Sequence, residues 1–161
     1  MSLINHRRRS AIWHGASQKV GQSAAPLFLD RIDIQCKITP VPFMGISKAA
    51  QGEPSAEIRK RVIRAREIQA ERFSGQKGIH CNAQMSERMI HQYAEPDEAG
   101  ISMLRMAMER LSLSARAYNR ILKVARTIAD LEGCEHVESH HLAEAIGYRT
   151  LDRGDWAERG I

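Results

Sequence analysis

Two arginines of this 161-residue chain lie where a cation could meet an anionic ligand. Arg116 falls in the first turn of a long predicted helix, whose backbone N–H groups already form a positive end that disfavours a cation. An arginine there makes physical sense if an anion binds beside those N–H groups, and phosphate is the usual one. The alternative is a solvated surface arginine, which the spacing alone favours.

Arg31 lies between two carboxylates, in the segment LDRID. A planar guanidinium can stabilise the charge that develops on a transferred phosphoryl group. The alternative is a local ion pair of Arg31 with Asp30 or Asp33, and the residues by themselves favour this pair.

The other residues capable of chemistry do not form a recognisable site. His80 and Cys81 are adjacent, but a metal ion needs about four ligands and no second pair is spaced to complete the set. His136, His140 and His141 invite a zinc interpretation, yet we expect only a polar helix start because no cysteine or carboxylate is fixed nearby. The sequence also lacks the phosphate-binding pattern G-x-x-x-x-G-K-[ST], so we expect that this chain alone does not hydrolyse ATP.

One long helix positions Arg116. Residues 112–133 are predicted to be helical, with Ser114 as the N-cap and Gly133 as the left-handed stop. Apolar residues at spacings of three and four predict a broad buried face: Ala117, Tyr118, Ile121, Leu122, Val124, Ala125, Ile128, Ala129 and Leu131. A second face is predicted to carry the polar residues Arg116, Arg120, Lys123 and Asp130.

A short strand is expected around Arg31. Apolar residues alternate with polar ones from Ile32 to Ile38, which predicts a strand over 31–38, and Pro40 ends it. A single strand needs a sheet that this sequence does not supply. The segment therefore indicates the end of a longer protein.

The rest of the chain predicts helices. Residues 55–73 form a basic helix with Ser55 as its expected N-cap, and shorter helices are expected over 86–94, 97–111 and 139–148, the last capped by Ser139. The fold class is therefore mainly α, with four to five helices after one strand. The expected organisation is a disordered or non-native arm, the end of a larger domain, a linker, the helical domain and a charged tail: 1–25, 26–45, 46–54, 55–148 and 149–161.

Composition narrows the class of protein. The net charge of +5 permits contact with nucleic acid or nucleotide but does not establish it. Cys36, Cys81 and Cys134 are far apart in sequence, which favours reduced thiols and a cytoplasmic protein. No run of 18 apolar residues occurs, so no membrane partner is expected.

Several separated motifs resemble one family. The segments LSARAYNRILKVARTIADLEG and HHLAEAIGYRTLDR, with PLFLDRIDI and NAQMS upstream, are similar to the C-terminal part of magnesium-chelatase-like AAA+ ATPases of the YifB and ComM type. The resemblance covers residues 26–153, and its motifs occur in the same order. It implies a helical AAA+ lid bundle, preceded by a strand from the α/β ATPase domain.

The resemblance also implies roles for both arginines. Arg116 resembles the sensor-2 arginine, which reaches the γ-phosphate of ATP, and Arg31 resembles a finger that reaches the ATP of a neighbouring subunit. The implied cofactors are ATP and Mg²⁺ in the full-length protein. The implied partners are the family's N-terminal ATPase core and the neighbouring subunits of a ring, with a hexamer expected. DNA is the favoured substrate, and metal insertion into a porphyrin is the alternative within the family.

A different class of function competes with this interpretation. The chain could be a stand-alone helical module that binds nucleic acid or a protein partner through the basic helix over 55–73. Phosphate contacts along such a helix would add salt-dependent affinity.

Overall fold

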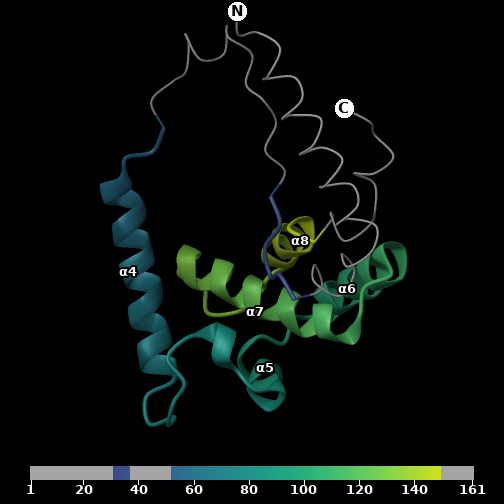
Figure 1. Ribbon diagram of the computed structural model, residues 1–161, viewed down its shortest axis with the longest axis horizontal. Coiled ribbons are helices and arrows are strands. Elements are labelled where there is room, and N and C mark those ends of the chain that lie inside the picture. Colours follow the sequence, from purple (N-terminus) through teal and green to yellow (C-terminus); the bar gives the residue numbers. More distant parts are fainter. Residues whose placement is uncertain (1–30, 37–51, 150–161) are drawn as a thin grey trace, which may run out of the picture.

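The computed structural model describes residues 31–36 and 52–149, which form a helical bundle (Figure 1). Five α-helices and one short 3₁₀ helix occur in this part of the chain. They are α4 (Ser55–Arg72), η1 (Asn82–Gln84), α5 (Glu87–Tyr93), α6 (Glu98–Leu111), α7 (Ala115–Glu132) and α8 (Ser139–Gly147). The predicted mainly helical class is confirmed. The arm over 1–25 and the tail beyond residue 149 lie outside the described residues.

Helix α7 runs through the centre of the bundle and contacts α4, α5, α8 and η1 (Figure 1). Its predicted N-cap and glycine stop are confirmed, while the helix itself begins at Ala115 and not at residue 112. The Ser114 hydroxyl accepts the backbone N–H of Ala117 at 3.1 Å, and Gly133 closes the helix with φ of 78°. Because Ala117, Ile121 and Leu122 are fully buried, the predicted apolar face does form the core.

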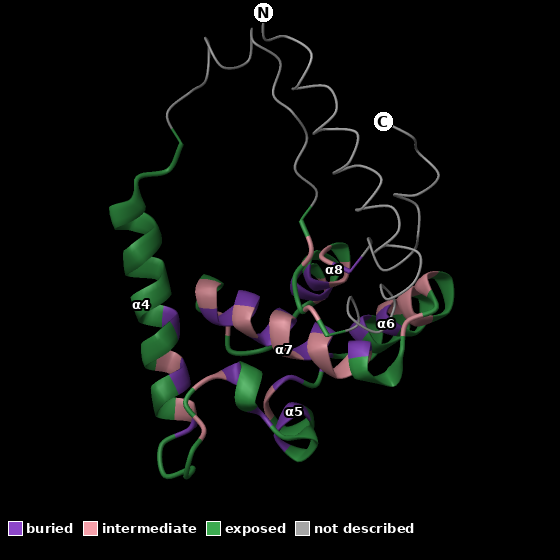
Figure 2. Ribbon diagram, in the orientation of Figure 1, coloured by how far each residue is buried: buried purple, intermediate pink, exposed green. Residues whose placement is uncertain are grey.

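The core joins α7 to the shorter helices. Leu104 of α6, Leu142 of α8 and Ile90 of α5 meet the buried face of α7, together with Phe73 at the end of α4. Burying such side chains is the main source of stability in a domain of this size. Figure 2 shows the buried residues along α7 and on the inner sides of its neighbours.

Three local predictions were wrong. Pro54, not Ser55, is the N-cap of α4, and no side chain caps that helix. Helix α8 is capped by Glu138 instead of Ser139, in a capping box that His141 completes by accepting the backbone N–H of Glu138 on Nδ1 at 2.9 Å. The described part of the expected strand, residues 31–36, has no strand structure, because no sheet edge exists among the described residues to pair with it.

Helix α4 is only half attached to the bundle. Its second half packs on α7 through Ala65 and Gln69, both of which are buried. Residues 52–64 are exposed throughout, and this end of α4 stands away from the other helices (Figure 2). The first half of α4 therefore extends past the edge of the bundle.

A close approach of α6 to α8 gives the first testable prediction. A Cβ at Gly100 would lie 2.6 Å from Leu142 Cδ1 and 2.7 Å from Pro96 Cβ. We expect Gly100→Ala to lower the free energy of unfolding by about 1–3 kcal/mol, since the overpacking outweighs the better helix propensity of alanine. Urea unfolding followed by circular dichroism measures this change.

The matched control is Gly147→Ala at the other end of α8. A Cβ at Gly147 would meet no atom within 4 Å. This variant should be as stable as the original chain or slightly more stable. Equal stability of the two variants would contradict the close approach at Gly100.

Candidate functional site

The polar face of α7 begins with the predicted arginine. Arg116, Arg120 and Lys123 lie at spacings of four and three, which places them on one side of the helix. The Arg116 side chain is exposed in the first turn, directly after the Ser114 cap. Its guanidinium therefore stands at the positive end of the helix, in a position suited to an anion.

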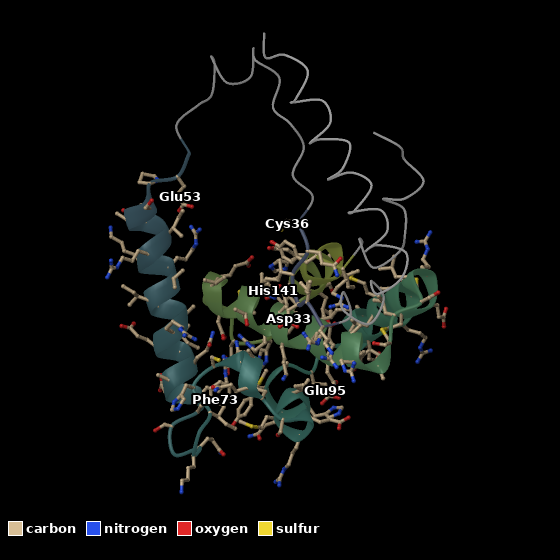
Figure 3. The ribbon with its side chains drawn as sticks, in the orientation of Figure 1. Asp33, Cys36, Glu53, Phe73, Glu95 and His141 are labelled. Carbon is tan, nitrogen blue, oxygen red and sulfur yellow. The ribbon has the colours of Figure 1, made fainter. Side chains whose placement is uncertain are left out.

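Arg120 binds the segment that carries Arg31. Its Nη1 donates a hydrogen bond to the backbone carbonyl of Arg31 at 2.6 Å and forms an ion pair with the carboxylate of Asp33. Figure 3 shows Asp33 over α7, far from Glu53 at the free end of α4. Asp33 thus pairs with Arg120, a partner that was not among the predicted alternatives for this segment.

The end of α8 holds the same segment at two further points. The buried side chain of Arg149 donates a hydrogen bond to the carbonyl of Ile32. The backbone N–H of Gln35 donates to the carbonyl of Tyr148 at 3.1 Å. Residues 31–36 therefore lie across α7 and the end of α8 as an extended segment fixed by single hydrogen bonds instead of a sheet.

The structure thus brings the two predicted arginines to one side of α7. The backbone of Arg31 is bound to Arg120, and Arg116 lies one helical turn before Arg120. The Arg31 side chain is exposed. Helix α7 therefore carries Arg116 directly and binds the backbone of Arg31 through Arg120.

The third cation of this face is engaged within the bundle. Lys123 Nζ donates to the carbonyl of Ala83 in η1 at 2.9 Å. Burial lowers the pKa of Lys123, while the nearby carboxylate of Asp33 acts in the opposite direction. Lys123 therefore anchors η1 to α7.

A buried ion-pair cluster lies at the other end of α7, and sequence reasoning missed it. Asp130 was predicted to lie on the polar face, but its side chain is fully buried. It accepts hydrogen bonds from Arg72 at 2.5 and 2.8 Å, from Asn82 at 2.7 Å and from Arg126 at 3.1 Å. The carboxylate therefore joins α4, η1 and α7.

The charges of this cluster are matched by hydrogen bonds. Burial alone would raise the pKa of Asp130, but hydrogen bonds from Arg72 and Asn82 and the charge of Arg126 outweigh burial and hold that pKa below its usual value. Arg126 also donates to the carbonyls of Cys134 and Glu135 at 2.6 and 2.7 Å. These bonds satisfy carbonyl groups just beyond the end of α7.

The histidines of α8 meet a carboxylate that the sequence analysis did not foresee. Glu132 Oε2 lies 2.8 Å from His140 Nε2 and 3.1 Å from His141 Nε2, so three potential metal ligands come together. However, Nδ1 of His141 accepts the backbone N–H of Glu138, which places the ring proton on Nε2. A protonated Nε2 cannot bind a metal ion, so this set of ligands fits a hydrogen-bonded cap and not a metal site. The hydrogen bond with Glu132 raises the pKa of His140.

The free half of α4 carries exposed apolar side chains. Ile58, Val62 and Ile63 are 42%, 46% and 47% exposed. Two ion pairs flank them, Glu53 with Arg61 at 2.6 Å and Glu57 with Lys60 at 2.8 Å. We call these apolar residues the α4 patch. Aliphatic side chains suit a protein partner better than a phosphate backbone.

None of the helices in the described part of the chain combines the length and the hydrophobicity that a membrane-spanning segment needs.

Comparisons with known proteins agree with this architecture. The family model described as "Magnesium chelatase, subunit ChlI C-terminal" matches residues 52–149, which include all of the described helices. Competence protein ComM of Haemophilus influenzae is 40% identical over 127 residues, which make up 78% of this chain and 24% of the relative. Protein YifB is 43% identical over 128 residues in Salmonella typhimurium and 38% identical over 128 residues in Escherichia coli. The chain thus spans about a quarter of the length of these relatives, 24% in each case.

Proposed function

This chain belongs to the family of the C-terminal part of magnesium chelatase subunit ChlI, and from that premise we propose that it is the lid of a magnesium-chelatase-like AAA+ ATPase. In this proposal the lid supplies arginines that sense bound nucleotide. The proposed motor is a ring in which the lid moves when ATP is hydrolysed. The family membership and the helical bundle support the proposal.

The observation that carries the proposal is the start of α7. Arg116 projects from the first turn of a helix whose cap and buried face are both well formed. A rigid helix of this kind can hold a guanidinium at a fixed position against the γ-phosphate of ATP. We propose that Arg116 makes this contact as the sensor-2 residue of its own subunit.

Arg31 is proposed to act across the subunit boundary. Its backbone is held on α7 while its side chain is exposed, which is the arrangement that a residue reaching into a neighbouring site needs. A planar cation there would stabilise the charge that develops on the transferred phosphoryl group. The resemblance of the LDRID segment to the family's finger supports this assignment.

The described residues fit one part of a nucleotide site. The N-terminal end of α7 offers the exposed guanidinium of Arg116 and the backbone N–H groups of the first turn, both of which suit a phosphate. ATP and Mg²⁺ would supply the reacting phosphoryl group and its counter-ion. We propose that the phosphate-binding loop comes from the N-terminal ATPase core of a longer polypeptide, and that this chain alone does not hydrolyse ATP.

DNA is the proposed substrate of the motor. The 40% sequence identity with a competence protein supports DNA as the substrate, and the net charge of +5 permits contact with its phosphates. Neighbouring subunits of a hexameric ring and the ATPase core are the proposed protein partners, in the cytoplasm.

The α4 patch supports a second candidate function. A stand-alone helical module would use this exposed end of α4 to bind a protein or nucleic acid partner. The three aliphatic side chains favour a protein among these partners.

A fusion protein tests the proposed function. The part of this chain that matches the Haemophilus influenzae ComM protein replaces the corresponding 127-residue part of that protein. ATP hydrolysis by the fusion is then measured with and without Arg116→Ala. We expect the substitution to reduce kcat about 100-fold, the loss typical of removing one preorganised donor from developing charge.

The matched control is Arg105→Ala, which removes an exposed arginine from α6. This variant should hydrolyse ATP at the rate of the unsubstituted fusion. A fusion that lacks ATPase activity, or equal rates for the Arg116 and Arg105 variants, would contradict the proposed function. The stand-alone module would then be the better interpretation.

A further inference from the structure

Arg120 connects α7 to the segment of Arg31 through its side chain. The same Nη1 atom bonds the carbonyl of Arg31 at 2.6 Å and pairs with the carboxylate of Asp33. The side chain of Arg120 is only 26% exposed, while that of Asp33 is 49% exposed. Arg120 is therefore fixed between the helix and the segment.

The position of Arg120 along α7 gives this contact its significance. Residues four apart in a helix are neighbours on one face, so Arg116 and Arg120 move together as parts of one rigid body. The carbonyl that Arg120 binds belongs to Arg31 itself. The Arg120 side chain therefore connects the turn of α7 that follows Arg116 to the backbone of Arg31.

The remaining contacts make the segment follow the helix as a unit. Arg149 and the carbonyl of Tyr148, both at the end of α8, bind Ile32 and Gln35. Helix α8 in turn packs on α7 through Leu142, which is fully buried. The segment is thus attached to the bundle at both ends, and Arg120 supplies the attachment at Arg31.

We propose that Arg120 is a positioning residue that couples the two nucleotide-facing arginines. It ties Arg31 to the turn of α7 that follows Arg116, so that movement of the lid by one ATP site also moves the finger that serves the next site. This inference rests on the proposed function of Arg116 and Arg31. In this inference Arg120 contacts no nucleotide itself and links neighbouring ATP sites of the ring.

Hydrogen exchange in this chain tests the physical part of the inference. The backbone N–H of Gln35 is bonded to Tyr148, so its exchange rate reports whether the segment stays attached. We expect Arg120→Met to increase this rate about tenfold, and Asp33→Asn to increase it by a smaller factor. Arg105→Met on α6 should leave the rate unchanged. An unchanged rate in the Arg120 variant would overturn the inference.

A double-mutant cycle in the ComM fusion tests the coupling. If Arg120 positions Arg31, then Arg31→Ala should lower kcat by a much smaller factor in the Arg120→Met background than in the original background. The KM for ATP should change little, because Arg120 does not contact the nucleotide. A purely structural role would leave the two effects independent.

The outcomes separate this inference from the proposed function. If Arg116→Ala lowers kcat but the effects of Arg31 and Arg120 multiply independently, the coupling is wrong and the lid function stands. If neither Arg116→Ala nor Arg31→Ala changes kcat, the proposed function fails and the coupling fails with it. Faster exchange at Gln35 together with a non-multiplicative cycle supports the inference.

Discussion

Asp130→Asn is expected to lower the free energy of unfolding by about 3 kcal/mol, although the substitution only replaces one carboxylate oxygen by an amide NH₂ group. The carboxylate is fully buried between Arg72 and Arg126, whose side chains are 12% and 2% exposed. The neutral amide would leave two guanidinium groups in the interior without a counter-ion. An uncompensated buried charge costs far more than the loss of an exposed pair.

Urea unfolding measures this effect, with Glu57→Gln as the matched control. Glu57 pairs with Lys60 on the exposed surface of α4, and the same chemical change there should cost less than about 0.5 kcal/mol. A loss below about 1 kcal/mol for Asp130→Asn would show that the cluster does not hold α4 on α7.

The cluster also predicts how stability depends on pH. The pKa of Asp130 is lower in the folded chain than its ordinary value, so its contribution is fully present above that ordinary value. The contribution is lost as the pH falls through the lower folded pKa. The difference in stability between the original chain and Asp130→Asn should therefore shrink progressively below about pH 4.

Leu142→Ala is expected to lower the free energy of unfolding by about 2–5 kcal/mol. Leu142 is fully buried in the core and connects α8 to the first turn of α6. Removing its branched end loses apolar burial and leaves a cavity that rigid helices on both sides cannot fill. Chemical unfolding at neutral pH measures the loss.

A double substitution makes this prediction more specific. The Cβ of Gly100→Ala would collide with Leu142 Cδ1, an atom that Leu142→Ala removes. The combined variant should therefore lose about 1 kcal/mol less than the two single losses added together. Simple additivity would contradict the direct contact between Gly100 and Leu142.

Local patterns were sufficient to predict α7. The Ser114 cap, the Gly133 stop and the apolar face depend on residues a few positions apart, so they are visible in the sequence. The two N-cap predictions were each wrong by one residue. At α4 the helix already begins with Ser55, so Pro54 occupies the N-cap position. At α8 the side chain of His141 closes a capping box with Glu138, which makes Glu138 the N-cap in place of Ser139.

Long-range partners could not be predicted in the same way. Asp130 is charged and lies on a helix, which normally indicates solvent, but Arg72, its partner, is 58 residues away in sequence. The prediction of a strand was wrong for a related reason. Residues 31–36 bind the side chain of Arg120 on α7 and the carbonyl of Tyr148 after α8, and not a neighbouring strand.

The residues of the candidate site likewise differ in whether local sequence could reveal them. Arg116 could be selected from its place in the helix and from the resemblance, and Arg31 from the resemblance alone. The role of Arg120 was hidden, because the carbonyl that it binds is 89 residues away. A surface arginine acquires such a role only when tertiary structure supplies its partner.

The unattached half of α4 makes that helix a lever. Ser55 lies ten positions before Ala65, the first buried residue of α4, and this distance corresponds to about 15 Å of helix. A rotation of about 10° where α4 packs on α7 would swing the Ser55 end through roughly 2.6 Å. A partner protein bound to the α4 patch would therefore be displaced when α4 rotates by a small angle on α7, while the helix itself stays unchanged.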